Sequence, residues 1–391
     1  MRSRPFLLAA TAITAAAALG GCVAPAVEAA RAPAPPPVAD AAPAAVTARL
    51  AAIAAQPEVG AIGLARIEGG RVAWTAYAGA RAPGVAADDA TWFNAASVAK
   101  TVLAETVLRL VAAGRLGLDD PLVDHHVHPD LADDPRAALL TPRRVLSHQS
   151  GLRNWASDYP DGKLAFVATP GDGRIRYSGA AIEMLRAYLE ARFGEPYPAL
   201  VERYLFAPLG VEEVEVVRAP HVAPMAQGVD ATGGWLPAFL RYEGGDIIAP
   251  GEVSAADNLY ATVPGYAKLL AGIGAGTGLD PALVAARMRL AARDDTPGSG
   301  YACEVADCPD PLGFGLGWAL FGSDTRTIVH HSGNDVAEHA QVWFEPETGD
   351  GVVLFMTGQA LFDDAIAILR TVDPEAPLVT YYDQMFAKYF P

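Results

Sequence analysis

Apolar and polar residues alternate over residues 60–79, which is the pattern of a half-buried β-strand. Ile62 and Leu64 precede the turn Glu68-Gly69-Gly70, and Trp74 follows it. Two alternating segments joined by such a turn predict a β-hairpin. Strand-like segments return late in the chain, at residues 327–331, 340–344 and 351–356.

Helical periodicity is clearest between these strands. Residues 97–113 predict a helix that ends at Gly114, because glycine is common just after the last helical turn. Its apolar stripe comprises Leu103, Val107, Leu110 and Val111. Similar patterns predict helices at 180–193, 263–273 and 361–369.

Strands at both ends of the chain around a helical middle predict an α/β (α+β) fold. We expect one antiparallel sheet, built from residues 46–115 and about 310–391 and flanked by helices. Residues from about 116 to 309 would form a mostly helical inserted subdomain. The folded domain would span residues 46–391.

Composition narrows the class of protein. The chain has 391 residues, of which 51% are hydrophobic and 19% are charged, too apolar a balance for a mainly disordered protein. The 45 acidic residues outnumber the 29 basic ones, and the formal net charge is −16. Because an acidic protein has no basic field to attract phosphate groups, we expect no nucleic-acid partner.

The first residues have the pattern of an export signal. Arg2 and Arg4 precede an apolar run over residues 6–19, which is too short for a stable membrane span. Leu19-Gly20-Gly21-Cys22 ends the run and resembles the lipobox of bacterial lipoproteins, where the signal is cut before a cysteine that then carries lipid. The alternative is an ordinary signal peptide cut at a nearby small residue.

Removal of the signal peptide, residues 1–21, would leave a lipidated Cys22 and an Ala- and Pro-rich tether over residues 22–45. We therefore expect a periplasm-facing lipoprotein of the bacterial cell envelope, held to the lipid bilayer by the acyl chains of Cys22. Val23 favours the outer membrane, by analogy with enteric lipoproteins. No other stretch reaches about 18 uninterrupted apolar residues.

The two other cysteines lie close together in the sequence, as Cys303-Glu-Val-Ala-Asp-Cys308. An exported protein meets an oxidising compartment, so we expect a local disulfide between Cys303 and Cys308. A metal site would need two more soft ligands nearby, and the sequence shows none there.

Ser97-Val98-Ala99-Lys100 is the sharpest local signal for chemistry. Residues three apart at the start of a helix share one face, and Lys100 continues the apolar stripe. Burial disfavours the charged amine, and a neutral amine near a hydroxyl can activate a serine nucleophile. The alternative is a serine near a helix N-terminus and a lysine whose amine reaches solvent.

The sequence context extends this motif along the chain. The relevant segments are FNAASVAKT (93–101), GLDDPL (117–122), LSHQSGL (146–152), RYSG (176–179), FAPLG (206–210), GLGW (315–318) and HSG (331–333). In this order they resemble the serine β-lactamase and penicillin-binding protein superfamily, and most closely its class C branch with β-lactamases, DD-peptidases and related esterases. The resemblance covers about 46–370 and implies the β-lactamase/transpeptidase-like fold.

The resemblance implies a role for each matching residue. Ser97 would be the acylated nucleophile and Lys100 its base. Tyr177 would share proton transfer, as a base only where neighbouring cations lower its pKa. His331 would lie on the strand that lines the cleft, orient the substrate and support the pair of Tyr177 and Lys100.

The same strand would complete the oxyanion hole. The resemblance places the backbone N–H groups of Ser97 and Asn334 there, with Ser332 and Gly333 beside them on the substrate side.

One position departs from the family pattern. Gly179 stands where the family has an asparagine whose amide contacts the lysine and the acylamide group of the substrate. The loss of that amide favours an esterase or a narrow peptidase over a β-lactamase. We expect Asn154 to fill part of the gap.

A histidine-rich segment offers a competing interpretation. His125-His126-Val127-His128-Pro129-Asp130 comes close to the ligand pattern of zinc β-lactamases, but Leu131 stands where the last histidine would be. We interpret this segment as a solvated loop and expect no metal and no cofactor. The remaining histidines are expected to be structural or exposed, namely His148, His221, His330 and His339.

We therefore expect a serine hydrolase that forms an acyl-enzyme on Ser97, with Lys100 and Tyr177 as general base. Its substrate would be a small molecule or peptide, namely a β-lactam, a D-Ala peptide or an ester. The alternative is a catalytically weak lipoprotein of the same fold that binds cell-wall peptide or a protein partner, with Gly179 as the sign of lost activity.

Overall fold

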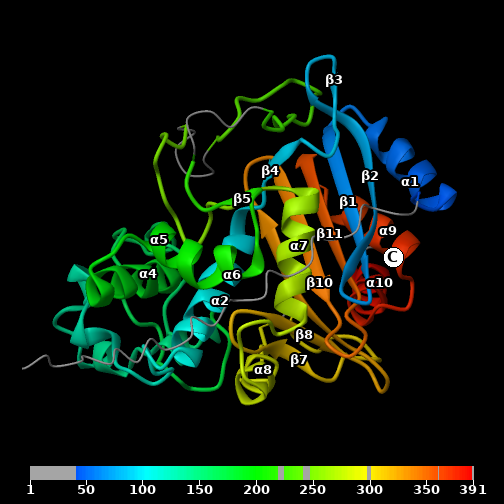
Figure 1. Cartoon of the computed structure of the whole chain (residues 1–391). Coiled ribbons are helices and arrows are strands. Elements are labelled where there is room, and N and C mark those ends of the chain that lie inside the picture. The colour runs from blue at the N-terminus through cyan, green and yellow to red at the C-terminus, as the bar shows by residue number, and fades with distance from the viewer. Residues whose placement is uncertain (1–40, 219–223, 241–246, 297–300, 360, 390–391) are drawn as a thin grey trace, which may run out of the picture. The chain divides into compact units, whose positions relative to one another are not determined.

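A large antiparallel sheet forms the centre of the computed structural model, which describes residues 41–218, 224–240, 247–296, 301–359 and 361–389 (Figure 1). Its eight strands lie in the order β3-β2-β1-β11-β10-β9-β8-β7. They are β1 (Val59–Glu68), β2 (Arg71–Ala82), β3 (Val85–Ala86), β7 (Leu312–Phe314), β8 (Ala319–Gly322), β9 (Thr327–Asn334), β10 (Glu338–Phe344) and β11 (Gly351–Gly358).

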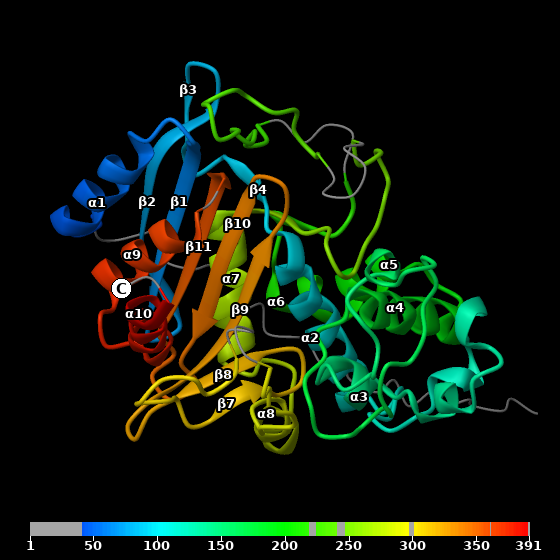
Figure 2. The same cartoon turned by 180° about the vertical axis from the view of Figure 1, so that it is seen from behind.

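Strands from both ends of the described domain meet inside this sheet (Figure 2). β1 pairs with β11, so that Leu64 lies opposite Leu354. On its other side β1 pairs with β2 through a turn in which Gly69 and Gly70 have φ values of 54° and 77°. Only glycine adopts this backbone conformation without steric cost. The predicted hairpin is confirmed, and so is a sheet assembled from both ends of the domain.

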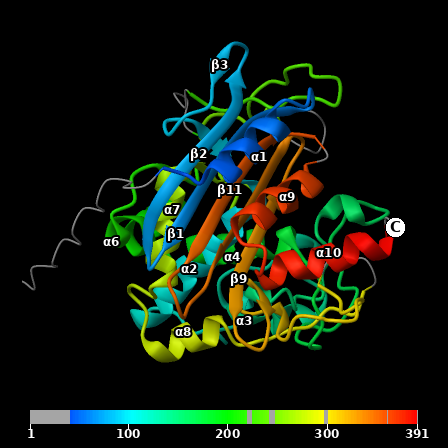
Figure 3. The same cartoon turned by 90° about the vertical axis from the view of Figure 1, so that its right-hand side faces the viewer.

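Helices cover both faces of the sheet. On one face lie α1 (Ala44–Ala54), α9 (Phe362–Val372) and α10 (Pro377–Tyr389), as Figure 3 shows. On the other face lie α2 (Ala99–Ala112) and α7 (Val263–Gly274). Alternate residues of β11 pack into the two apolar cores, Leu354 into the first and Phe355 into the second. The predicted fold class is confirmed.

The remaining helices lie mostly beyond α2, away from the sheet (Figure 2). They are α3 (Pro142–Leu146), α4 (Gly179–Phe193), α5 (Tyr197–Val201), α6 (Ala207–Leu209) and, near β7, α8 (Pro281–Arg287). The predicted helices at 180–193, 263–273 and 361–369 correspond to α4, α7 and α9 with slightly shifted ends. None of the helices in the described part of the chain has the length and apolar character of a membrane span.

A second, small sheet was not expected. Its strands are β4 (Trp92–Asn94), β6 (Tyr260–Thr262) and β5 (Val214–Glu215), paired in that order. Two of them fall in the region that the sequence predicted to be helical. β4 leads directly into the segment that carries Ser97, so this sheet fixes where that segment begins.

The central helix α2 differs from its prediction in one respect. The sequence predicted a single buried stripe, but every residue of α2 from Ala99 to Leu110 is buried. The reason is that α2 lies between the large sheet on one side and the helices α4 and α5 on the other. Val111, expected on the stripe, is only partly buried.

A buried charge cluster stabilises this helix. The Glu105 carboxylate pairs with Arg109 at 2.6 Å and with Arg287 of α8 at 3.1 Å, and it accepts a 3.0 Å hydrogen bond from Trp318 Nε1. Burial alone would raise the pKa of Glu105, but the Arg287 and Arg109 guanidinium groups hold it below its usual range. The cluster thereby connects α2 to α8 and to the turn between β7 and β8.

Removal of the Glu105 carboxylate should therefore destabilise the whole domain. We expect Glu105→Ala to lower the free energy of unfolding by about 3–5 kcal/mol, because two arginines would stay buried without their counter-ion. Urea denaturation measures the change. Glu68→Ala is the control. The Glu68 side chain is 60% exposed and forms a 3.6 Å ion pair with Arg66, so its loss should lower the free energy of unfolding by at most about 1 kcal/mol. Equal losses in both variants would contradict this role of Glu105.

Candidate active site

Ser97 lies in a tight turn between β4 and α2, within a 3₁₀ segment at Ala96–Val98. The preceding residue, Ala96, has a φ of 46°, a conformation that costs energy for any residue but glycine. The surrounding structure holds it there. The Asn94 side chain accepts a 3.0 Å hydrogen bond from the Ala96 N–H, and the Ala95 N–H donates to the Leu259 carbonyl at 2.7 Å. The Ser97 side chain remains partly exposed.

Lys100 lies against this serine, as the sequence predicted. Its Nζ is 2.8 Å from Ser97 Oγ and 2.6 Å from the carbonyl oxygen of Ala256. The residue is only 1% exposed. Burial lowers the pKa of Lys100 to about 8, although the carboxylates of Asp257 and Glu183 act in the opposite direction. A substantial share of the amine is therefore neutral near pH 8 and can accept a proton.

Tyr177 lies beside the amine, with its ring centroid 4.9 Å from Lys100 Nζ. Burial raises the pKa of Tyr177 above its usual range and outweighs the lowering effect of a hydrogen bond with Ser97. Tyr177 was expected to act as a base only if its pKa were lowered, but its pKa is raised. The phenol therefore keeps its proton at neutral pH.

The ring of His148 stacks on Tyr177, with centroids 4.3 Å apart. Burial, with a contribution from Lys100, lowers the pKa of His148 to about 3, so the imidazole is neutral. From the sequence, His148 was expected to be structural or exposed, and its contact with Tyr177 was not predicted. Its place in the LSHQSGL segment was the only available signal.

β9 carries the other expected site residues past the serine. His331 is buried, its ring centroid is 6.3 Å from that of Tyr177, and its Nδ1 lies 2.7 Å from the Ser332 carbonyl oxygen. Burial, then the charge of Lys100, lowers the pKa of His331 well below its usual value. This histidine is therefore neutral.

Gly333 and Asn334 follow on the same strand. A Cβ on Gly333 would lie 2.1 Å from the Ala95 carbonyl oxygen, so only glycine lets β9 come this close to the serine turn. The same point is 3.2 Å from the Ser97 backbone nitrogen. Asn334 is exposed at the end of β9, and its side-chain oxygen bonds to His339 Nδ1.

A cleft of about 680 Å³ opens beside Ser97. Polar and aromatic residues line it, including Asn154, Trp155, Ser254, Asn258 and Asn334. Five acidic residues also line it, namely Asp158, Glu183, Glu252, Asp257 and Asp335. No lysine or arginine occurs among the residues that line the cleft in the described part of the chain.

Trp155 explains how the chain accommodates Gly179. A Cβ on Gly179 would lie 2.4 Å from the Trp155 ring, so the indole occupies the space of a side chain at that position. Asn154 was expected to fill part of the gap. Its side-chain oxygen instead accepts a 2.8 Å hydrogen bond from the Gly179 N–H at the start of α4. The sequence analysis identified neither Trp155 nor the Ala256 carbonyl.

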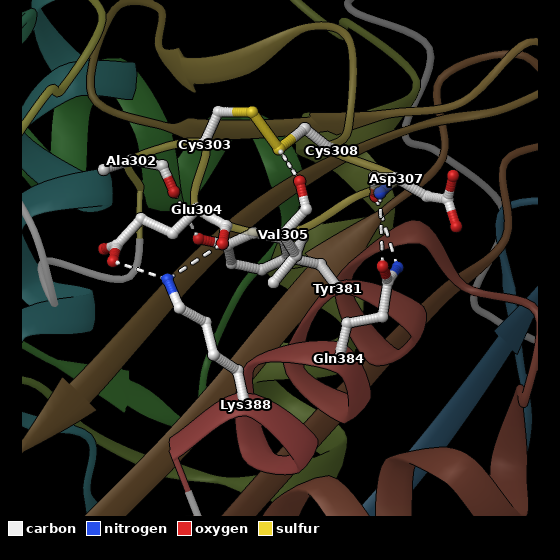
Figure 4. Close-up of a disulfide and its surroundings, with 9 residues drawn as sticks. All are labelled: Ala302, Cys303, Glu304, Val305, Asp307, Cys308, Tyr381, Gln384 and Lys388. Atoms are coloured by element: carbon white, nitrogen blue, oxygen red, sulfur yellow. Dashed lines mark hydrogen bonds and ion pairs between the residues drawn. A yellow bond between two sulfur atoms is a disulfide. The ribbon is translucent and has the colours of Figure 1, made fainter.

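The Cys303–Cys308 disulfide is present, as predicted (Figure 4). Its loop packs on α10, where Lys388 Nζ donates to the Glu304 carbonyl at 2.9 Å and Tyr381 donates to the Ala302 carbonyl at 2.7 Å. Neither cysteine lines the cleft beside Ser97. The disulfide therefore closes this loop on itself, and the hydrogen bonds from Lys388 and Tyr381 attach the loop to α10.

Two other expectations fall elsewhere. The lipidation residue Cys22 lies outside the described residues. In the histidine-rich segment, His128 Nδ1 accepts a hydrogen bond from the Asp130 N–H at 3.2 Å. Within the described ranges, no three His, Cys, Asp or Glu residues gather closely enough to hold a metal ion.

Comparison with known proteins agrees with this arrangement. The chain matches the family described as Beta-lactamase over residues 46–373. It is 29% identical to esterase EstB of Burkholderia gladioli over 276 residues, which is 58% of this chain and 69% of the esterase. It is 27% identical to penicillin-binding protein 4 of Amycolatopsis lactamdurans over 312 residues, 71% of this chain and 75% of that protein.

Solved structures show the same fold. The octameric penicillin-binding protein homologue from Pyrococcus abyssi aligns with a TM-score of 0.68 at 20% identity, covering 85% of this chain and 78% of that one. The D-amino acid amidase of Ochrobactrum anthropi SV3 aligns with a TM-score of 0.64 at 20% identity, covering 87% and 98%. From the family match over most of its length, this protein belongs to the β-lactamase family and is, in general terms, a serine hydrolase.

Proposed function

We propose that the protein hydrolyses esters or uncharged amides by acyl transfer through Ser97. The observation that carries this proposal is the 2.8 Å contact between Ser97 Oγ and the buried Lys100 amine. The neutral amine takes the hydroxyl proton while Oγ attacks the substrate carbonyl carbon. The N–H groups of Ser97 and Asn334 receive the negative charge that develops on the carbonyl oxygen.

Collapse of this tetrahedral species breaks the bond to the leaving group, which takes the proton from Lys100. Tyr177 retains its own proton and can pass one on, since its phenol lies beside both the amine and the serine. Water then attacks the acyl-Ser97 ester and gives a proton to Lys100. Lys100 passes this proton to Ser97 Oγ as the bond to the acyl group breaks, which releases the acid and restores the serine hydroxyl and the neutral amine. His331 stays neutral and packs behind Tyr177 as a support.

Three features support esters or uncharged amides over β-lactams and D-Ala peptides, both of which carry a carboxylate. Trp155 fills the space where an amide-bearing side chain at residue 179 would contact an acylamide group. The five acidic residues that line the cleft would repel a substrate carboxylate. One curated relative, 29% identical, is an esterase, although another is a penicillin-binding protein.

Replacement of the nucleophile tests the chemistry. We expect Ser97→Ala to lower the turnover of a p-nitrophenyl ester by at least about 1,000-fold and to abolish labelling by a fluorophosphonate. Ser323→Ala, at an exposed serine in the turn after β8, should retain both. Unchanged turnover in Ser97→Ala would reject the proposal. A stable adduct on the wild-type protein without turnover would favour the binding protein instead.

The space around Gly179 gives a second prediction. We expect Gly179→Asn to lower the free energy of unfolding by about 1–3 kcal/mol, because the new side chain overlaps the Trp155 ring. In a Trp155→Ala background the same substitution should cost less, with a coupling energy of about 0.5 kcal/mol or more by urea denaturation. Additive losses in the double variant would show that the two residues do not compete for this space.

We further propose that Cys22 carries the lipid that anchors the protein in the cell envelope, from the Leu19-Gly20-Gly21-Cys22 motif alone. The wild-type protein from a bacterial host should have an acylated N-terminal cysteine by mass spectrometry and should sediment with membranes. Cys22→Ser should be unlipidated. A wild-type N-terminus without acyl chains would refute the anchor and leave the catalytic proposal intact.

A further inference from the structure

We propose that Glu183 is a positioning residue that orients and tunes the Lys100 amine through the peptide between Ala256 and Asp257. This inference rests on the proposed function of Ser97 and Lys100. Glu183 lies outside the sequence motifs identified above, in α4, four residues after Gly179. Residues four apart on a helix share a face, so its side chain projects beside the Gly179 position.

The amine itself sets the first requirement. A neutral primary amine has two hydrogens and one lone pair, and the lone pair must face the Ser97 hydroxyl to receive its proton. The 2.6 Å hydrogen bond from Lys100 Nζ to the Ala256 carbonyl takes one hydrogen and thereby limits how the amine can rotate. The position of this carbonyl therefore decides where the lone pair points.

Glu183 holds that carbonyl in place through its peptide. The peptide that presents the Ala256 carbonyl also carries the Asp257 N–H, which donates to Ser254 Oγ at 3.0 Å. Ser254 Oγ in turn donates to Glu183 Oε1 at 2.6 Å. The same carboxylate oxygen accepts the Ala256 N–H at 2.9 Å. We call this chain from carboxylate to hydroxyl, peptide and amine the Glu183 relay.

The charge of Glu183 gives the relay a second effect. Burial lowers the pKa of Lys100, and the carboxylates of Asp257 and Glu183 partly restore it. Arg186 holds Glu183 in this orientation through a 2.6 Å contact between its Nε and Glu183 Oε2, on the side away from the relay. Gly179 has no side chain that could bond to the Lys100 amine. The amine instead bonds to the Ala256 carbonyl, which the Glu183 relay holds in place.

The test compares the pH dependence of kcat/KM for p-nitrophenyl butyrate in purified variants. In the wild-type protein kcat/KM should rise with pH as Lys100 loses its proton. The midpoint of this rise, here called the pH limb, should lie near the Lys100 pKa of about 8. Glu183→Gln keeps an oxygen acceptor but removes the charge. We expect it to retain most of kcat and to move this limb to lower pH.

Variants that break the relay should lose rate instead. We expect Glu183→Ala and Ser254→Ala each to lower kcat by about 10- to 100-fold, because the Ala256 carbonyl loses its support and the amine its orientation. Glu190→Gln is the matched control, since Glu190 also lies in α4 and pairs with Arg186 at 2.7 Å but does not contact the loop. It should leave both the limb and kcat unchanged.

The outcomes separate the two proposals. If Ser97→Ala remains active, the proposed function fails and the relay fails with it. If Ser97 is essential but Glu183→Gln follows the wild-type pH profile, the relay alone is refuted. If Glu183→Ala does not fold, Glu183→Gln still decides, because a merely structural role would not move the pH limb.

Discussion

The contact between a buried lysine amine and a serine hydroxyl is the feature on which the rest of this structure depends. Burial lowers the pKa of Lys100 to about 8, and Lys100 is buried because α2 is buried on every side from Ala99 to Leu110. The same helix is the centre of the core, and the Glu105 cluster holds its next turn. Stability and reactivity therefore depend on one element.

The sheet brings the second half of the site to this helix. β9 comes from the C-terminal part of the chain, yet it passes so close to the serine turn that Gly333 has no room for a side chain. His331 and Asn334 reach the site because of this approach. The neighbouring aromatic groups, Tyr177 and His148, form an uncharged layer around the amine.

Another part of the domain also contributes to the cleft. Trp155, from the segment before α4, and Glu183, from α4 itself, line it together with Asn334 of β9. The Trp155 indole occupies the space beside Gly179 that a side chain there would need. Five acidic residues line the cleft, and the Lys100 amine donates a hydrogen bond to the Ala256 carbonyl.

Short-range features were predictable from the sequence because helix, turn and disulfide geometry fixes the relative positions of residues that are a few positions apart in the chain. This applies to the Ser97–Lys100 spacing, the hairpin around Gly69 and the Cys303–Cys308 pair. The strand patterns at both ends of the chain also indicated the sheet built from both ends. The sequence carried no sign that Trp155 fills the space beside Gly179 or that Ala256 bonds to Lys100. Such contacts join segments whose relative position no local periodicity encodes, so only the tertiary packing decided them.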